Sequence, residues 1–385
     1  MTTGHDGKGT VDIARYRRQV TLAGFGLAAQ ERLASSHVAV LGAGGLGSPA
    51  LLYLAAAGVG GVTVIDDDTV ATSNLHRQVI HVDAAVGEPK TASARREMLA
   101  RNPDLVVHVV DARLTADNAV ELLQDADIVL DGTDNFAARH ACSHACAVLG
   151  IPHVWGSILG FDAQLSVFGT HLPDGTPGPV YEDVFPAPPE PGTVPSCSAA
   201  GVLGPVVGVV GTAMALEAVK VLTGVGEPLA GTIGYFDGLS GRWEYITVQA
   251  DPAVADRVGA APTPVTEQLA VEPSDDAADA DDSGDSGIPD LDAAVLLDVR
   301  EPDEFATVHI PGAVNVPLSV LRGGADGEVP EEVSRVVDRA SASSRPLVVY
   351  CGSGVRSLRA VDILASAGIS ALNYPGGIDA WLERR

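Results

Sequence analysis

The stretch HVAVLGAGGLGSPALLYLAAA, residues 37–57, joins an apolar run to a glycine-rich turn and then to a helical pattern. Residues 37–41 have the aliphatic content of a buried strand. Glycine at four of the six positions 42–47 permits a tight turn and lets backbone N–H groups approach a phosphate at the start of a helix. Strand, turn and helix in this order predict a nucleotide-binding α/β fold with a parallel sheet.

Short β-rich runs recur along the next part of the chain and alternate with helical patterns, which is typical of parallel strands joined by crossover helices. Examples are VTVID (62–66), LVVHVV (105–110) and DIVLDG (127–132). Asp66 ends the first of these runs, 19 residues after Gly47, and is placed to accept hydrogen bonds from ribose hydroxyls. NAD, FAD and ATP all suit this fingerprint, so a nicotinamide-linked oxidoreductase remains an alternative on this evidence.

The charged residues that follow favour ATP over a dinucleotide. Backbone dipoles suffice for the pyrophosphate of a dinucleotide, whereas a site that expels pyrophosphate needs cations on the triphosphate and a carboxylate for Mg²⁺. Arg77 in SNLHRQ (73–78), Lys90, and Asp134 in DGTDN (131–135) supply these groups. Lys90 is one of only three lysines in the chain, which makes a casual surface role less attractive.

Composition divides the chain into three zones. Residues 10–250 carry the alternating pattern, and β-rich runs return over residues 288–385, as in PLVVYCG (346–352). Between them, residues 251–287 contain the acidic, small-residue tract PSDDAADADDSGDSG, which has nothing to bury. We therefore predict two α/β domains joined by an acidic flexible linker at 251–287.

Charge and hydropathy argue against two kinds of partner. The formal net charge is −26 and no basic stripe exists to neutralise phosphates, which argues against nucleic acid. Residues 199–216 are free of charge and long enough for a membrane span. They contain four glycines and Pro205, so a buried loop and helix is the better interpretation, and we expect no membrane contact.

The cysteines indicate a reducing location. Four thiols dispersed over 385 residues do not resemble a disulfide framework, and the N-terminal residues lack the apolar core of a signal peptide. We therefore expect the protein to be cytoplasmic.

Five motifs in order resemble those of the MoeB/ThiF adenylyltransferases, bacterial relatives of ubiquitin-activating enzymes. They are RYRRQ (15–19), GAGGLGSPA (42–50), IDDDTVATSNLHRQ (65–78), GEPK (87–90) and DGTDN (131–135). The resemblance covers residues 10–250. It implies a Rossmann-like, ATP-binding α/β domain that adenylates the C-terminal glycine of a small ubiquitin-like sulfur-carrier protein of the MoaD, ThiS or CysO type.

The same resemblance implies roles for single residues. Asp134 would hold Mg²⁺, while Arg77, Lys90 and Arg18 would offset charge on the phosphates. Arg18 would do so in the partner subunit's site of a homodimer, although the residue alone suggests only a solvated charge on a helix. The residues that the resemblance places against ATP are Gly45, Asp66, Ser73, Asn74, Leu75, His76, Arg77, Lys90, Asp134 and Asn135.

Many members of this family hold a structural zinc with two C-x-x-C pairs. Here Val180 and Asp183 stand where the first pair would be, and the region of the second pair, near residues 250–257, has no cysteine. Since no C-x-x-C spacing occurs anywhere in the chain, a tetrahedral thiolate site cannot be assembled and we predict no zinc.

Three of the four cysteines require separate interpretations. Cys142 and Cys146 share a helical pattern with His140 and His144, but the two residue types fall on different faces, so ordinary helix residues are the expected interpretation. Cys197 lies in a proline-rich segment where the family places a cysteine that takes up the adenylate as an acyl thioester or acyl persulfide. A buried small residue is the alternative for Cys197.

The C-terminal zone resembles the rhodanese domain, a smaller α/β fold, over residues 288–385. The matching segments are LLDVREPDEFATVHIPGAVNVP (296–317) and CGSGVR (351–356). A strand delivers Cys351 to a loop that opens a helix, so backbone N–H groups, the helix dipole and Arg356 are expected to stabilise a thiolate. That arrangement suits sulfur acceptance as a persulfide.

A phosphatase is the alternative for the second domain, because related folds surround a phosphate with C-x₅-R. The spacing from Cys351 to Arg356 is C-x₄-R, and the smaller cradle favours a sulfur atom. Four further residues are expected to brace the fold rather than react: Asp298, Arg300, Glu304 and His309.

Both motif sets on one chain predict an adenylyltransferase and sulfurtransferase, with Cys351 as the persulfide carrier. The product would be a carrier thiocarboxylate for molybdenum cofactor, thiamin or cysteine-linked pathways. The expected sulfur donor is thiosulfate or the persulfide of a cysteine desulfurase. The rival hypotheses are a nicotinamide oxidoreductase with an appended sulfur sensor and a non-catalytic scaffold that binds carrier proteins.

Overall fold

The computed structural model describes residues 11–169, 176–188, 201–265, 291, 293–322, 330–343, 345–352 and 354–383. The chain forms two compact units, Met1–Ala270 and Val271–Arg385. Each unit has its own sheet and its own hydrophobic core, as the two predicted α/β domains require.

The sheet of the first unit has eight strands in the order β3-β2-β1-β4-β5-β6-β7-β8. The strands are β1 (His37–Leu41), β2 (Gly61–Ile65), β3 (Val106–Val110), β4 (Ile128–Asp131), β5 (His153–Leu159), β6 (Asp162–Phe168), β7 (Thr232–Asp237) and β8 (Arg242–Thr247). The neighbouring strands β3, β2, β1, β4 and β5 are parallel, and β6, β7 and β8 continue the sheet with antiparallel pairing. The four strands predicted from the β-rich runs between residues 37 and 132 are confirmed.

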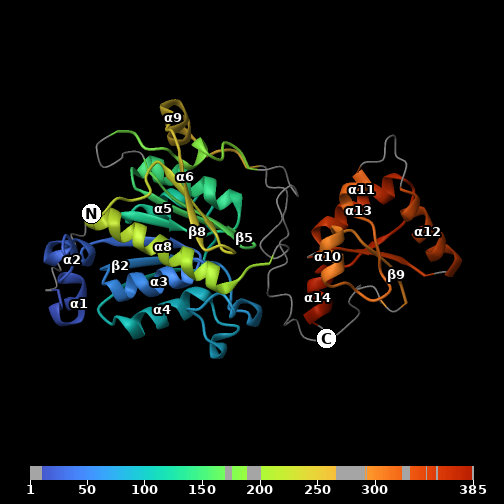
Figure 1. Cartoon of the computed structure of the whole chain (residues 1–385), viewed down its shortest axis with the longest axis horizontal. Coiled ribbons are helices and arrows are strands. Elements are labelled where there is room, and N and C mark those ends of the chain that lie inside the picture. The colour runs from blue at the N-terminus through green and yellow to red at the C-terminus, as the bar shows by residue number, and fades with distance from the viewer. Residues whose placement is uncertain are drawn as a thin grey trace. The chain divides into compact units, whose positions relative to one another are not determined.

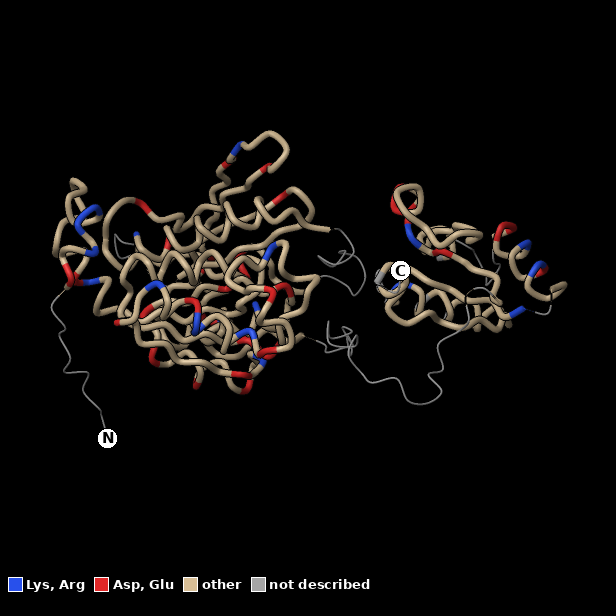
Figure 2. The backbone as a smooth tube through the Cα atoms, turned by 90° about the horizontal axis from the view of Figure 1, so that it is seen from below, with Lys and Arg blue, Asp and Glu red and all other residues tan. Residues whose placement is uncertain are grey.

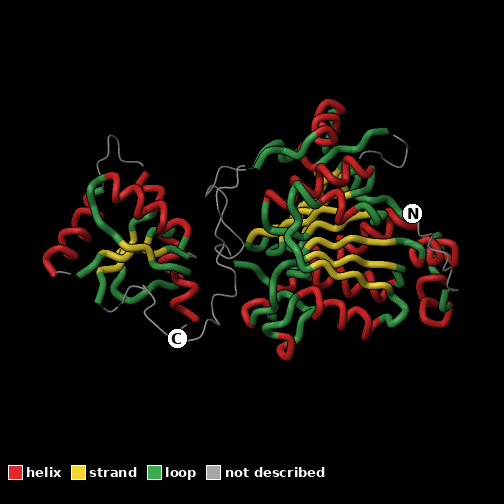
Figure 3. Tube along the Cα trace, turned by 180° about the vertical axis from the view of Figure 1, so that it is seen from behind, coloured by secondary structure: helices red, strands yellow, loops and turns green. Residues whose placement is uncertain are grey.

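Helices cover both faces of this sheet (Figures 1 and 3). Their bounds are α1 (Ile13–Val20), α2 (Gly26–Ala34), α3 (Gly47–Ala57), α4 (Lys90–Arg101), α5 (Ala119–Leu123), α6 (Phe136–Leu149), α8 (Gly204–Thr223) and α9 (Pro252–Ala260). Helices α3, α4 and α8 share the larger apolar cluster, and α5 and α6 share a second cluster with the sheet's other face. The result is the three-layer arrangement expected of a parallel sheet.

Helix α8 contains most of the apolar stretch noted in the sequence. It is the one described helix that is long and apolar enough to cross a membrane, and half of its most apolar window is buried in the fold. A Cβ on Gly211 would lie 2.3 Å from the carbonyl oxygen of Leu46, so glycine lets α8 pack directly on the start of α3. This is how a core helix packs in the first unit.

The first unit extends beyond the boundary that the sequence suggested. Residues 251–260 were expected to begin the linker, but Pro252–Ala260 form α9. Asp251 caps this helix by accepting from the N–H of Ala253 at 2.9 Å, and Val258 is fully buried. His144 of α6 bonds the carbonyl oxygen of Val258 at 2.6 Å. The rest of the expected linker from residue 266 onward lies outside the described residues.

The second unit is a smaller α/β layer structure. Its parallel sheet has the order β10-β9-β11-β12, made of β9 (Val295–Asp298), β10 (Val314–Asn315), β11 (Leu347–Tyr350) and β12 (Leu372–Asn373). The helices are α10 (Pro302–Thr307), α11 (Leu318–Arg322), α12 (Glu331–Ser343), α13 (Val355–Ser366) and α14 (Gly377–Glu383). Apolar clusters lie on both faces of the sheet, and the interior strand β11 leads directly to Cys351.

Candidate active sites

The loops after β1, β2 and β4 meet at one edge of the first sheet. Strand β1 pairs with β2 on one side and with β4 on the other. The chain moves outward from β1 to β3 and then returns to place β4 against the opposite side of β1. Open α/β sheets bind ligands in the crevice outside the carboxyl ends of strands at such a reversal. The loops beginning at Gly42, Asp66 and Gly132 therefore define the first candidate site.

The glycine loop between β1 and α3 is packed too closely for side chains. A Cβ on Gly47 would lie 1.8 Å from the carbonyl oxygen of Gly42, and one on Gly45 would lie 2.9 Å from Cγ1 of Val207. Gly42 also has a φ of +85°, which favours glycine. Within the described residues no side chain caps the N-terminus of α3, so its N–H groups and helix dipole are available for an anion.

Two side chains fix the peptide of Ala43 at the centre of this loop. Asp66 Oδ2 accepts from the N–H of Ala43 at 2.7 Å, and Nε2 of His81 bonds its carbonyl oxygen at 3.0 Å. Ser93 bonds the other ring nitrogen of His81 at 2.9 Å. Burial raises the pKa of Asp66 despite the charge of Lys90, and burial lowers the pKa of His81 to about 4. His81 is therefore neutral near pH 7.

The sequence interpretation assigned Asp66 to ribose and did not find His81. In the structure, Asp66 shapes the loop with one oxygen and accepts from the N–H of Asp68 with the other at 2.9 Å. Each oxygen retains a second lone pair for a ribose hydroxyl. His81 lies three residues after the SNLHRQ motif, but no pattern pointed to its contact with a loop 38 residues away.

Lys90 begins α4 and is buried, with 5% of its side chain exposed. Its ammonium group pairs with Asp68 Oδ2 at 2.7 Å, and the side chain of Asp68 is half exposed. A buried ammonium group is costly without a partner, and Asp68 supplies that partner. Because Asp68 is half exposed, water can solvate its carboxylate when Lys90 moves to a ligand. The sequence predicted Lys90 at this site but not Asp68 as its partner.

Residues 73–77 form the wall of the site next to α8. Arg77 is held by its own segment, donating to the carbonyl oxygen of Ser73 and bonding the ring of His76, both at 2.9 Å. A Cβ on Gly204, the first residue of α8, would lie 2.3 Å from the carbonyl oxygen of His76. Asn74 is buried, Leu75 is half-buried and Ser73 is exposed. Burial, with the charge of Arg77, lowers the pKa of His76.

Asp134 and Asn135 lie in the loop after β4 and are exposed. Asn135 caps α6 by accepting from the N–H of Ala138 at 2.7 Å. Arg139 holds the preceding turn, with Nη2 donating to the carbonyl oxygen of Thr133 at 2.7 Å. The backbone on either side of Asp134 is thus fixed while its carboxylate remains open to solvent and to a ligand.

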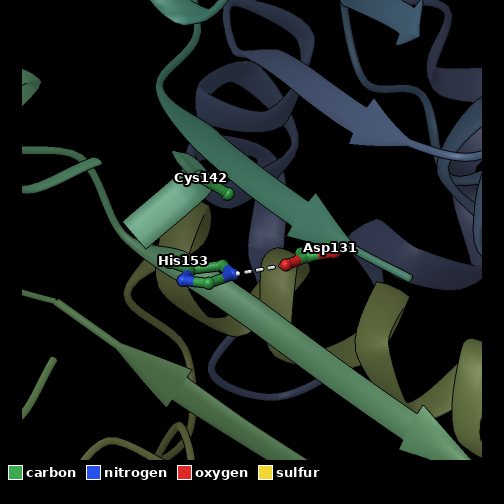
Figure 4. Close-up of side chains that lie close together, drawn as sticks. All are labelled: Asp131, Cys142 and His153. Atoms are coloured by element: carbon green, nitrogen blue, oxygen red, sulfur yellow. Dashed lines mark hydrogen bonds and ion pairs between the residues drawn. The ribbon is translucent and has the colours of Figure 1, made fainter. Parts of the chain in front are cut away.

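Figure 4 shows a buried trio beneath this loop: Asp131 at the end of β4, His153 at the start of β5 and Cys142 on α6. Their ligand atoms lie within 4.8 Å of one another. The carboxylate is already engaged, however, because Oδ1 accepts from the N–H and hydroxyl of Thr133 at 2.9 and 2.7 Å and Oδ2 lies 3.2 Å from Nε2 of His153. Burial alone would raise the pKa of Asp131, but contacts with His153 and Thr133 lower it.

Cys142 completes the trio as a protonated thiol. Burial raises its pKa well above the ordinary value, and its sulfur lies 3.9 Å from that of Cys146. On the next faces of α6, His140 bonds Glu182 and His144 bonds the backbone of α9, so histidines and cysteines do face different ways. The trio braces the turn that carries Asp134, which agrees with ordinary structural roles for the α6 cysteines.

Val180 and Asp183 are the residues that the sequence resemblance aligns with a first cysteine pair. Val180 offers no ligand atom, and both oxygens of Asp183 are engaged, accepting from the N–H groups of Val180 at 2.8 Å and Asp251 at 3.1 Å. These hydrogen bonds join the short 3-10 turn Tyr181–Asp183 to the start of α9. The residues present do not fit a tetrahedral thiolate site. Cys197 lies outside the described residues.

Arg18 lies on α1, away from the glycine loop. Its guanidinium is exposed and makes no hydrogen bond or ion pair within the described part of the chain. Figure 2 shows the arginines of α1 in blue at one end of the unit. Tyr16 anchors the helix, since it is buried, its hydroxyl accepts from Asn102 at 3.2 Å, and a Cβ on Gly58 would lie 2.4 Å from its ring.

The second candidate site is the loop after β11. Cys351 is 1% exposed, and its sulfur accepts from the N–H of Gly354 at 3.2 Å. The hydroxyl of Ser357, which is fully buried, lies 3.5 Å from the same sulfur. Gly354 has a φ of +94° and is the N-cap residue of α13, so the thiol faces the helix N-terminus as predicted.

Arg356 does not extend freely over this loop. Its two terminal nitrogens donate to the two oxygens of Glu304, each at 2.7 Å. This is the bidentate geometry of a strong guanidinium–carboxylate pair. Asp298 and Arg300 form a second, deeper pair at 2.6 Å beneath Tyr350. The expected bracing role of Glu304 is thus more specific than the sequence suggested, because its partner is the loop arginine itself.

The fold and the two sites define a class: a nucleotide-binding α/β domain joined to a second α/β domain with a cysteine loop at a helix start. The ThiF family model matches residues 16–255 and the rhodanese-like domain model matches residues 284–384. The chain belongs to the ThiF family and carries a C-terminal rhodanese-like domain. The two resemblances drawn from the sequence, and the fold class with them, are confirmed.

Relatives with both domains align along nearly the whole chain. The "probable adenylyltransferase/sulfurtransferase MoeZ" of Mycobacterium tuberculosis is 41% identical, covering 97% of this chain and 93% of the relative. The "adenylyltransferase and sulfurtransferase MOCS3" of Drosophila grimshawi is 36% identical, with 97% and 84% covered. The "sulfur carrier protein adenylyltransferase" of Thermus thermophilus is 47% identical over 63% of this chain and 89% of its own length.

Solved structures show the same fold at lower identity. Escherichia coli MccB superposes with a TM-score of 0.54 at 21% identity, covering 63% of this chain and 72% of that chain. PaaA superposes with a TM-score of 0.52 at 23% identity, covering 64% and 78%. Both comparisons support the architecture of the first unit.

Proposed function

We propose that this protein adenylates the C-terminal glycine of a small ubiquitin-like sulfur-carrier protein and then helps to convert it into a thiocarboxylate. The observation that carries the proposal is the presence of both sites on one chain: an open phosphate cradle with a buried lysine, and a cysteine loop at a helix N-terminus. The names of the full-length relatives combine the same two activities. Carriers of the MoaD, ThiS or CysO type fit, and with them the molybdenum cofactor, thiamin or cysteine-linked pathways.

In the first step, a carboxylate oxygen of the carrier attacks the α-phosphorus of ATP. A P–O bond forms, the bond to the β-phosphate oxygen breaks, and pyrophosphate leaves with the electron pair. ATP use is what an adenylyltransferase of this family requires. Positioning and charge neutralisation supply most of the acceleration in such a transfer.

The residues divide this work. The N–H groups around Gly45 donate hydrogen bonds to phosphate oxygens, and Asp66 accepts hydrogen bonds from the ribose hydroxyls. Lys90 leaves Asp68 and binds the triphosphate. Arg77 and its neighbours from Ser73 to His76 line the opposite wall, and Asn135 holds the loop on which Asp134 stands. Mg²⁺ bound by Asp134 would supply further positive charge on the phosphates.

In the second step, Cys351 carries the sulfur. Its persulfide attacks the carbonyl carbon of the acyl adenylate, and AMP leaves. A thiolate then attacks the Cys351 sulfur of the resulting acyl disulfide, so that the S–S bond breaks and the thiocarboxylate departs. A disulfide between the Cys351 sulfur and the attacking thiol remains, and a dithiol reductant reduces it to two thiols and leaves as a disulfide. Cys197 is the residue of this chain proposed to supply the attacking thiolate or to hold the acyl group on the way.

The state of the protein is part of the proposal. We propose a homodimer in which Arg18 enters the partner's site, supported by its exposure and by the firm anchoring of α1 through Tyr16. We propose no zinc, since Val180 offers no ligand atom and both carboxylate oxygens of Asp183 already accept hydrogen bonds. A cytoplasmic location is supported by the buried, free thiols of Cys142, Cys146 and Cys351. The proposed sulfur donor is thiosulfate or a cysteine desulfurase persulfide, and we propose no nucleic acid or membrane partner.

The full-length protein should catalyse exchange of labelled pyrophosphate into ATP when given Mg²⁺ and its cognate carrier. A panel of purified carriers ending in Gly-Gly tests this, with a carrier lacking its last glycine as the matched control. Exchange with at least one intact carrier and none with its truncated form is the expected result. No exchange with any carrier would remove the adenylation proposal, and tight NAD(P)H binding in a fluorescence titration would favour an oxidoreductase instead.

A further inference from the structure

The loop arginine of the second site is already neutralised by a carboxylate. Arg356 and Glu304 form two parallel hydrogen bonds of 2.7 Å, and their side chains are 25% and 26% exposed. Although burial opposes ionisation, the hydrogen bonds from Arg356 and Glu301 lower the pKa of Glu304. The hydrogen bond and charge of Glu304 raise the pKa of Arg356 in turn. Both groups therefore stay charged at neutral pH.

The guanidinium next to this pair is not free to act in place of Arg356. Arg300, the neighbouring guanidinium, is 4% exposed and tied to Asp298 and to the carbonyl oxygen of Val308. Arg356 is the only charged residue of the loop sequence CGSGVR, and residues 288–385 contain no lysine. The same residues hold 9 arginines against 14 acidic residues, so this part of the chain carries a net negative formal charge.

Sulfur donors differ in the charge that they bring to this site. The Cys351 thiolate attacks the sulfane sulfur of thiosulfate, a new S–S bond forms, and sulfite leaves with the electron pair of the broken S–S bond. Methanethiosulfonate transfers sulfur in the same way and releases methanesulfinate. Neither reaction needs an oxidant or reductant. Thiosulfate carries two negative charges, whereas methanethiosulfonate and a protein-borne persulfide carry at most one.

We propose that Glu304 determines the class of sulfur donor by occupying Arg356. A dianion must either displace the carboxylate from two hydrogen bonds or dock against a neutralised pair, whereas a donor with at most one negative charge needs no such displacement. The second site is therefore set for sulfane sulfur of low charge, of which a protein persulfide is one source and a small thiosulfonate another. Glu304 acts through Arg356 and is a specificity-determining residue rather than a catalytic one.

The proposal rests on the sulfur-transfer function and is tested with the full-length chain. Persulfide formation on Cys351 is followed by the mass of one added sulfur atom, with thiosulfate and methanethiosulfonate as the two donors. In Glu304→Gln, the ratio of kcat/KM for thiosulfate to that for methanethiosulfonate should rise about three- to tenfold, as expected for removal of a charged competitor from a partly buried pair. The change should appear in KM for thiosulfate rather than in kcat.

Glu304→Gln keeps an oxygen for the N–H of Glu301, which Glu304 accepts at 3.1 Å as part of the cap of α10. Asp303→Asn is the matched control. Asp303 is exposed in the same turn, and within the described residues its carboxylate makes no hydrogen bond or ion pair with Arg356, so its donor ratio should equal that of the wild type. Loading by methanethiosulfonate verifies that each variant is folded.

The outcomes separate the inference from the function beneath it. Normal loading with the same donor ratio in wild type and Glu304→Gln would overturn the role of Glu304 alone. An equal rise in Asp303→Asn would also overturn it, since the effect would then belong to the general field. No loading of wild-type Cys351 by either donor or by a cysteine desulfurase persulfide would overturn the sulfur-transfer function itself and this inference with it.

Discussion

Lys90 in the first unit and Arg356 in the second each hold a carboxylate at 2.7 Å, but their surroundings differ. Lys90 is buried while its partner Asp68 is half exposed, so water can take the place of the ammonium group on Asp68. Arg356 and Glu304 are about equally exposed and share two hydrogen bonds. Releasing Lys90 to a triphosphate costs one contact on a solvated acid, whereas releasing Arg356 costs a bidentate pair. The first site is thus poised to capture a polyanion and the second is not.

The largest effect should come from the cysteine of the second site. Cys351→Ser removes the sulfur nucleophile, so persulfide formation and thiosulfate turnover should be abolished. Carrier-dependent pyrophosphate exchange should stay within about twofold of wild type, because a substitution in one unit should not change a site in the other when the two sites act independently. Mass spectrometry and the exchange assay on one preparation check both halves. A parallel fall in exchange would mean that the two units do not act independently.

The reciprocal change is Asp134→Asn in the first site. Loss of the carboxylate proposed for Mg²⁺ should lower pyrophosphate exchange by about 10²–10³-fold, the scale of a lost electrostatic contact in the transition state. Loading of Cys351 with sulfur should be unchanged. Asp117→Asn, at an exposed position of the same unit, is the matched control. Asp127 is less suitable because its carboxylate accepts a hydrogen bond from the N–H of His37 at 2.8 Å. Exchange at the wild-type rate in Asp134→Asn would remove this residue from the mechanism.

Lys90 and Asp68 test the asymmetry of their pair. Lys90→Met should lower exchange by about 10²-fold, since a positive charge on the phosphates is lost. Asp68→Asn should change exchange by less than about threefold, because an exposed partner contributes little. Initial rates of exchange at several ATP concentrations measure both. A larger loss in Asp68→Asn than in Lys90→Met would reverse the assignment of which residue serves the ligand.

The smallest effect concerns the support beneath the glycine loop. Burial lowers the pKa of His81 to about 4. Between pH 6.5 and 4, His81 is therefore protonated in the unfolded chain but neutral in the folded chain. Stability is therefore lost as the pH falls through this window, by on the order of 2 kcal/mol between pH 7 and 5. Urea titrations of wild type and His81→Gln at both pH values should show a weaker pH dependence in the variant. Equal dependence would place the proton elsewhere.

Local sequence patterns predicted most of the fold, but they did not predict the contacts between residues that are distant in the sequence. The strands, the glycine turn and the cysteine loop are each encoded within a few neighbouring residues, so periodicity and motif spacing sufficed. The partners of Lys90, Ala43 and Arg356 lie 22, 38 and 52 residues away, and no local pattern specifies a contact over such separations. Helix α9 was missed for another reason: Asp251 followed by Pro252 is a helix-start signal, but it was assigned to the linker because of the acidic tract that follows.

Lysine is so rare in this chain that its chemistry becomes selective. Of the three lysines, Lys8 lies outside the described residues, and Lys220 is engaged by Glu217 and by the carbonyl oxygen of Glu227. Lys90 alone among the described amines lies beside the phosphate cradle. An acyl-phosphate derivative of ATP, which transfers its label to a nearby amine, should therefore label Lys90 in the purified protein and report directly on occupancy of the site.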